Sequence, residues 1–151
     1  MRGVQSVDEE VITSLERLVK NQPRSTALVY LGEKFSYSDL QELIYRFAAA
    51  LHSLGVRDND KVMLYLGNSI QWVIAYYAIQ KIGGVVVPTS PIYTPYEISY
   101  QLNHSEAQTI ICQDTNFGYV SKVFEGTPLK RVIVTNLGDM QIGRASCRER
   151  V

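Results

Sequence analysis

Residues 61–88 decide the fold, and they read KVMLYLGNSIQWVIAYYAIQKIGGVVVP. The apolar run at 61–66 is typical of a strand buried on both faces, which favours a parallel sheet. After Asn68, the expected cap, residues 69–82 predict a helix that is apolar nearly all round and therefore buried between layers. The glycine pair 83–84 ends this helix, and the apolar run 85–87 predicts a second strand. A strand, a helix and a strand in this order predict a right-handed crossover between parallel strands.

The same alternation continues toward the carboxyl terminus. Residues 94–97, TPYE, combine a capping threonine, a proline and an acid in the first turn, so a helix is expected from there to about residue 103. A strand, a helix and a last strand are predicted at 108–112, 115–124 and 131–135. The predicted fold class is α/β, a layered, mostly parallel sheet with helices on both faces.

A helix and a β-hairpin are predicted before this sheet. Apolar side chains at helical spacing predict the helix over 11–19, and two short runs predict hairpin strands at 27–31 and 34–37.

A second amphipathic helix is expected over 38–54. A capping-box pattern at Ser38 and Gln41 is expected to open it, and Gly55 is expected to end it in the left-handed conformation.

Composition excludes several classes of function. Of 151 residues, 46% are hydrophobic, and 15 basic residues balance 15 acidic ones, so no basic patch for nucleic acid is indicated. No apolar run approaches the roughly 18–20 residues that a membrane-spanning helix needs. We therefore expect no nucleic-acid partner, no transmembrane segment and a cytoplasmic location. The two cysteines, Cys112 and Cys147, are expected neither to form a disulfide nor to bind a metal.

The last ten residues depart from the pattern before them. The segment 142–151, IGRASCRERV, holds three arginines and shows neither alternation nor a helical stripe. One permitted back-translation, ATC GGA AGA GCG TCG TGT AGG GAA AGA GTG, resembles a common sequencing-adapter oligonucleotide. We expect a domain over 1–141 and a non-native read-through tail over 142–151, with a genuine basic surface tail as the alternative.

Ligands of open parallel sheets bind beyond the carboxyl ends of the strands. Three loops qualify here, at 67–69, 88–94 and 113–115. The loop at 88–94 holds two prolines, which lower the entropy cost of ordering it and so specify a fixed shape. Two interpretations stay open for this loop: a substrate-side or interdomain surface, and a rigid connection without a further role.

No side chain of this chain is predicted to be catalytic, cofactor-binding or metal-binding. A phosphate cradle needs glycines between a strand and the following helix, whereas the pair 83–84 follows a helix and precedes a strand. His52 and His104 have no second ligand at metal spacing, and Asp58 and Asp60 precede a strand instead of following one. No P-loop, dinucleotide fingerprint or nucleophile elbow is present.

Several segments of the chain resemble the adenylate-forming, or AMP-binding, superfamily. The resemblance spans about residues 35–135, and the Pro-x-Tyr-Thr element at 91–94 is most similar to the long-chain fatty acyl-CoA synthetase branch. Luciferase-like and aryl-CoA ligase relatives share much of the pattern. The segments that carry it are FSYSDL (35–40), DKV (60–62), LGNS (66–69), AIQKIGGVVVP (78–88), PIYTPYEI (91–98) and QLNHSEA (101–107).

The resemblance implies a two-step reaction in a longer parent enzyme, an acyl-CoA ligase. A fatty or other carboxylic acid attacks the α-phosphate of ATP, bound with Mg²⁺, and gives an acyl-adenylate and pyrophosphate. The thiol of coenzyme A then displaces AMP. In this family the phosphate loop, the adenine- and ribose-binding segments and a mobile lysine lie downstream, and none of these motifs occurs here. The chain alone is therefore expected to be inactive and to bind none of ATP, Mg²⁺ and coenzyme A tightly.

Two other classes of function are kept as alternatives. One is a self-contained, non-catalytic α/β binding or interaction module. The other is an amino-acid-activating domain of a peptide synthetase, which shares the fold and differs in downstream pocket residues.

Overall fold

The structure, a computed structural model, describes residues 11–140 of the chain, so the expected tail at 142–151 lies outside the described residues. Helix α1 (Val11–Asn21), hairpin strands β1 (Thr26–Tyr30) and β2 (Glu33–Ser36), and helix α2 (Tyr37–Ser53) come first. Strands and helices then alternate as β3 (Lys61–Tyr65), α3 (Ile70–Lys81), β4 (Val85–Thr89), α4 (Pro95–Ser105), β5 (Thr109–Gln113), the 3-10 turn η1 (Asp114–Asn116), α5 (Phe117–Val123), β6 (Arg131–Thr135) and the 3-10 turn η2 (Leu137–Met140).

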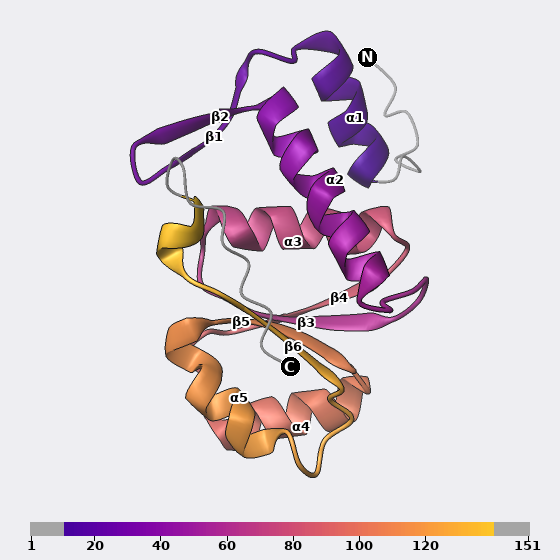
Figure 1. Cartoon of the computed structure of the whole chain (residues 1–151), viewed down its shortest axis with the longest axis vertical. Helices are drawn as coiled ribbons and strands as arrows, with labels where there is room; N and C mark the ends of the chain where they lie inside the picture. The colour runs from indigo at the N-terminus through magenta and orange to yellow at the C-terminus, as the bar shows by residue number, and fades with distance from the viewer. Residues whose placement is uncertain (1–10, 141–151) are drawn as a thin grey trace, which may run out of the picture.

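Four strands form one parallel sheet in the order β4-β3-β5-β6. Met63 of the central strand β3 pairs with Val87 of β4 and with Ile110 of β5. The chain moves from β3 to β4 on one side and returns to β5 on the other side of β3, so its helices fall on opposite faces. Figure 1 shows α2 and α3 above the sheet and α4 and α5 below it. The predicted α/β fold, with a helix and a β-hairpin before the sheet, is confirmed.

Successive residues of β3 enter two separate apolar cores. Val62 and Leu64 pack in the core that holds α1, α2 and α3, whereas Met63 and Tyr65 pack with α4 and α5. All four side chains are fully buried, because a strand sends successive side chains to opposite faces of its sheet. A strand covered on both faces has to be apolar throughout, which is why residues 61–66 predicted a parallel sheet.

Helix α3 lies between α2 and the sheet, as Figure 1 shows. Ile70, Ala78 and Ile79 of this helix are completely buried. Trp72 and Tyr76 are half-buried, and their rings stack at a centroid distance of 5.2 Å. The predicted burial of this helix between layers is confirmed, and its uniform apolarity follows from having neighbours on both sides.

Ser36 caps α2, and the predicted cap at Ser38 is wrong. The Asp39 backbone N–H donates to Ser36 Oγ at 3.1 Å, and the Ser36 backbone N–H donates to the Asp39 carboxylate at 2.9 Å. The sequence offers two capping patterns two residues apart, and the end of β2 decides between them. Because β2 ends at Ser36 in extended conformation, Tyr37 already belongs to the helix.

Other boundaries differ from the prediction by similar amounts. Ser69, not Asn68, caps α3, because the Trp72 N–H donates to Ser69 Oγ at 3.2 Å. The helix predicted at 115–124 opens as the 3-10 turn η1 before α5. The predicted end of α2 is confirmed: Gly55 has a φ of +89°, and its carbonyl accepts a hydrogen bond from Arg131 of β6 at 3.0 Å.

Replacing Ser36 by alanine should lower the free energy of unfolding by about 1 kcal/mol, because the capping hydroxyl is lost. Ser38→Ala, the matched change two residues later, should stay within about 0.5 kcal/mol of the parent chain. Urea unfolding of the three chains measures both effects. Equal losses for the two variants would contradict the assignment of the cap to Ser36.

One polar cluster joins the three helices on the upper face of the sheet. Lys81 Nζ of α3 lies 2.6 Å from Glu16 Oε1 of α1, and the Tyr45 hydroxyl of α2 donates to the same oxygen at 2.7 Å. The Lys81 ammonium also lies 4.8 Å from the centroid of the Tyr45 ring. The hydrogen bonds from Lys81 and Tyr45 hold the pKa of Glu16 below its ordinary value.

This cluster should make stability depend on pH in a defined direction. A carboxylate with a lowered pKa in the folded state stabilises the fold above its ordinary pKa and loses that contribution as the pH falls below about 4.3. Glu16→Gln should therefore reduce the loss of stability between pH 7 and about pH 3. Asp39 and Glu97 have lowered pKa values too, so the test is the difference between the two chains. Identical pH profiles of unfolding would contradict the role of Glu16.

Candidate functional site: the carboxyl edge of the sheet

The carboxyl ends of the parallel strands place the three predicted loops along one edge of the sheet. The Tyr65 hydroxyl, at the end of β3, donates to the Tyr93 carbonyl at 2.6 Å. The Asn116 side-chain amide, after β5, donates to the Pro91 carbonyl at 2.9 Å. The loop at 88–94 is thus bonded to residues at the ends of both β3 and β5, and the prediction that these loops share one edge is confirmed.

Further hydrogen bonds hold the 88–94 loop at both of its ends. The buried Thr89 hydroxyl donates to Gln101 Oε1 of α4 at 2.8 Å. At the other end, Thr94 Oγ and the Glu97 carboxylate form the predicted capping box of α4, with the Thr94 N–H donating to Glu97 at 2.8 Å. These bonds favour the interpretation of a rigid connection. The interpretation of an interdomain surface stays a proposal, and Ile92 at the tip of the loop is 84% exposed.

Gln71 is the residue at this edge that sequence reasoning missed. It is the second residue of α3, it is buried, and its Nε2 donates to the Asn136 carbonyl after β6 at 2.9 Å. Its Oε1 has no hydrogen-bond partner among the described residues. One signal could have found it: Gln71 is a polar residue in the first turn of a helix predicted to be apolar nearly all round.

The charges at this edge do not suit a nucleotide triphosphate. The loop segments 66–69, 90–94 and 113–116 contain no lysine or arginine and include the acidic Asp114. Binding and activating a triphosphate needs cationic side chains or ordered backbone N–H groups around the phosphates. The described loop segments at this edge therefore supply no cationic side chain to a phosphate group.

Cys112 of β5 is not an activated nucleophile. Its side chain is fully buried, and burial, with a smaller contribution from the Asp114 carboxylate, raises the pKa of the thiol to about 12. A nucleophilic cysteine needs a lowered pKa and access to solvent. Cys112 instead packs as a small apolar residue in the core between the sheet and helices α4 and α5.

The Cys147→Ser chain, which keeps only Cys112, should resist iodoacetamide at pH 8 in the folded state. The same chain should be alkylated completely in denaturant, because unfolding exposes Cys112 and restores an ordinary thiol pKa of about 8.5. Mass spectrometry of the intact chain measures both. Native labelling at a rate near the denatured one would contradict the burial of Cys112.

The two histidines, for which the sequence predicted no metal-binding role, lie on different helices. His52 is exposed on α2, and His104 stacks on Tyr100 of α4 at a centroid distance of 5.9 Å. Gly83 follows α3 with a φ of +76°, as a helix-ending glycine does. Within residues 11–140, no group of three or more His, Cys, Asp and Glu side chains could hold a metal ion.

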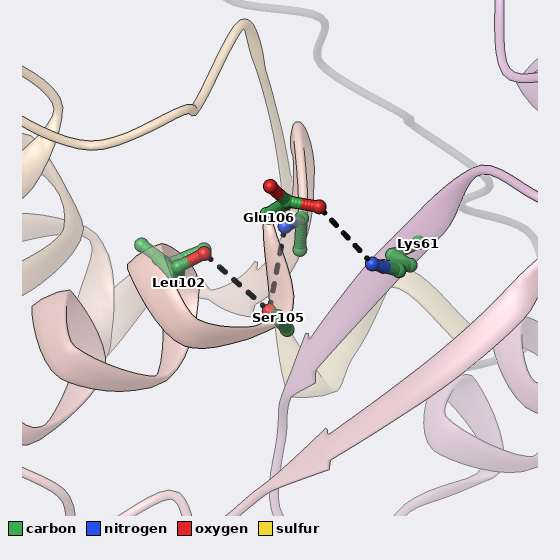
Figure 2. A network of polar contacts seen from close by, with 5 residues as sticks. Lys61, Leu102, Ser105 and Glu106 are labelled. Atoms are coloured by element: carbon green, nitrogen blue, oxygen red, sulfur yellow. Dashed lines mark hydrogen bonds and ion pairs between the residues drawn. The ribbon is translucent and has the colours of Figure 1, made fainter.

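Asp58 and Asp60 lie at the opposite, amino edge of the sheet, as predicted. There the Arg57 N–H donates to the Asp60 carboxylate at 2.8 Å, and a polar cavity of about 410 Å³ lies between the starts of β3 and β5. Figure 2 shows the Glu106 carboxylate reaching from the end of α4 toward Lys61, with 3.5 Å between the charged atoms. An exposed ion pair of this kind contributes at most about 1 kcal/mol to the stability of the fold.

Comparison with known proteins agrees with the sequence resemblance. The AMP-binding enzyme family matches residues 15–146 of this chain. A long-chain-fatty-acid–CoA ligase of Escherichia coli O6:H1 is 34% identical over 133 residues, which cover 87% of this chain and 24% of the relative. The corresponding Bacillus subtilis ligase is 32% identical over 117 residues, 78% of this chain and 21% of that relative. The chain therefore belongs to the AMP-binding enzyme family.

Solved structures share the fold. A long-chain-fatty-acid-CoA ligase from Archaeoglobus fulgidus superposes with a TM-score of 0.82 at 23% identity, covering 88% of this chain and 28% of that one. A benzoate CoA ligase from Burkholderia xenovorans LB400 gives a TM-score of 0.76 at 27% identity, covering 82% of this chain and 25% of that one. The described residues thus adopt a fold that recurs within acyl-CoA ligases.

The chain spans about a quarter of the length of these relatives. The family match runs beyond residue 141, so the domain boundary predicted there stays a prediction. In the described part of the chain, no helix is long and apolar enough to cross a membrane.

Proposed function

We propose that this chain is the amino-terminal part of an ATP-dependent acyl-CoA ligase. The proposed reaction joins a fatty or other carboxylic acid to coenzyme A through an acyl-adenylate, with Mg-ATP converted to AMP and pyrophosphate. The observation that carries the proposal is the family match over residues 15–146, together with relatives named long-chain-fatty-acid–CoA ligases. A cytoplasmic location, a domain over 1–141 and a non-native tail over 142–151 belong to the same proposal.

In this proposal the chain contributes structural elements of the enzyme and no catalytic residues. Its carboxyl-edge loops lack cationic side chains, so the groups that clamp the ATP phosphates are proposed to come from the remaining part of the longer protein. The described residues hold the first strands of the sheet in register and fix the loop at 88–94 by hydrogen bonds. We therefore propose that the 151-residue chain is inactive by itself.

The longer gene product tests this function. It should convert at least one of a short, a medium, a long and an aromatic acid to its CoA thioester, with one AMP released per thioester formed. Product analysis by mass spectrometry, with ATP omitted as the control, measures the conversion. Failure with all four acid classes would contradict the ligase proposal and favour the self-contained binding module.

A further inference from the structure

Gln71 holds a buried polar atom whose partner is missing from the described residues. The residue is 8% exposed, and its Oε1 has no hydrogen-bond donor within the described part of the chain. Leaving a buried acceptor unpaired costs about 1–3 kcal/mol, and buried side-chain oxygens in native proteins are therefore nearly always paired. The missing donor needs a physical explanation.

The N–H groups of Gly138 and Trp72 donate to acceptors other than Gln71 Oε1. Gln71 Nε2 donates to the Asn136 carbonyl at 2.9 Å, and the Gly138 N–H donates to the Asn136 side chain at 2.8 Å. The nearby Trp72 N–H donates to Ser69 Oγ at 3.2 Å. Neither N–H group donates to Gln71 Oε1, although the Gln71 side chain lies where the chain leaves β6 for η2.

An internal water is a poor substitute for the missing donor. A buried water needs about 2–4 polar partners, and Gln71 Oε1 is the one buried side-chain nitrogen or oxygen without a partner among residues 11–140. Ile70 and Ile74, which lie on the same helix as Gln71, are buried and apolar. A backbone N–H group needs no further polar partners of its own at this position, so it suits the apolar environment of Gln71 Oε1 better than a water molecule does.

We propose that Gln71 docks the polypeptide that follows residue 140 in the longer ligase. Its Oε1 accepts a hydrogen bond from an N–H group of that polypeptide, while its Nε2 holds the Asn136 carbonyl. Gln71 is thus a positioning residue, which fixes the path of the chain as it leaves the carboxyl edge of β6. The inference rests on the proposed function, because that function places further polypeptide after residue 140.

Hydrogen exchange of the longer gene product tests this role. Gln71→Met keeps the length of the side chain and removes both polar atoms. It should raise amide exchange in one segment beyond residue 140 by roughly three- to tenfold, as expected for the loss of one hydrogen bond. Gln101→Met, which removes the bond to Thr89 on the other side of the sheet, should leave that segment unchanged. Faster exchange confined to 70–81 and 131–140 would show that Gln71 acts through Asn136 alone and would overturn the inference.

A crystal structure of the unsubstituted longer product gives a second test, which does not require the Gln71→Met variant to fold. An N–H donor from beyond residue 140 within about 3.2 Å of Gln71 Oε1 is expected. A partner within residues 11–140, a water or no partner would overturn the inference. If that product makes acyl-CoA while Oε1 is paired elsewhere, the inference fails and the ligase function stands. If it makes none while the downstream donor is present, the ligase function fails and the docking role stands.

Discussion

The purified 151-residue chain should catalyse no ATP–pyrophosphate exchange above background with any fatty or aromatic acid. Exchange requires the ATP phosphates to be clamped while the carboxylate attacks the α-phosphorus, and removing even one such stabilising donor typically costs about 10²–10³ in rate. The loop segments 66–69, 90–94 and 113–116 supply no cationic side chain at all. We therefore expect no measurable ATP–pyrophosphate exchange by this chain.

Radiolabelled pyrophosphate incorporation into ATP measures this exchange with high sensitivity. The longer gene product serves as the positive control, and a heat-denatured sample sets the background. Exchange by the short chain that depends on added acid would contradict the assignment of the phosphate-binding groups to the remaining part of the longer protein.

Ile79→Ala should lower the free energy of unfolding by about 2–5 kcal/mol, the range for truncating a buried isoleucine. Ile79 of α3 is completely buried between α2 and the sheet, so removing three carbon atoms from its side chain leaves a cavity in the core. Since a domain has a net stability of about 5–15 kcal/mol, this is one of the largest effects that a single substitution can have here.

Ile92→Ala is the matched control for this prediction. The same atoms are removed from a side chain that is 84% exposed at the tip of the 88–94 loop, so stability should change by less than about 0.5 kcal/mol. Urea unfolding of the two variants and the parent chain gives the comparison. Similar losses for both variants would contradict the placement of α3 between two layers.

The layered sheet could be predicted from the sequence because its strands and its central helix are buried on both sides. Residues 62–65 and 110–112 are apolar without alternation, and α3 is apolar nearly all round, a combination that fits few other arrangements. Glycines with positive φ at positions 55 and 83 marked the helix ends correctly, since left-handed backbone strongly favours glycine. The amino caps were harder, because Ser36 and Ser38 both offer a hydroxyl, and the end of β2 decides between them.

The candidate site could be predicted only as a set of loops. Parallel strands place their carboxyl ends at one edge, so the loops after β3, β4 and β5 had to lie near one another. The bonds that tie them together, Tyr65 to Tyr93 and Asn116 to Pro91, join residues 28 and 25 positions apart, and no local pattern records such contacts. The unpaired Gln71 Oε1 escaped prediction for the same reason, since its environment comes from the end of β6.

The reading frame beyond Gln141 in the source DNA tests the central claim most directly. If this chain begins an adenylate-forming ligase, the native frame should continue for several hundred codons and reach a serine-, threonine- and glycine-rich phosphate loop similar to Thr-Ser-Gly-Thr-Thr-Gly. Sequencing outward from a primer within codons 95–135 determines this without expression or assay. A natural stop codon shortly after Gln141 would contradict the ligase and leave the self-contained binding module as the function of this fold.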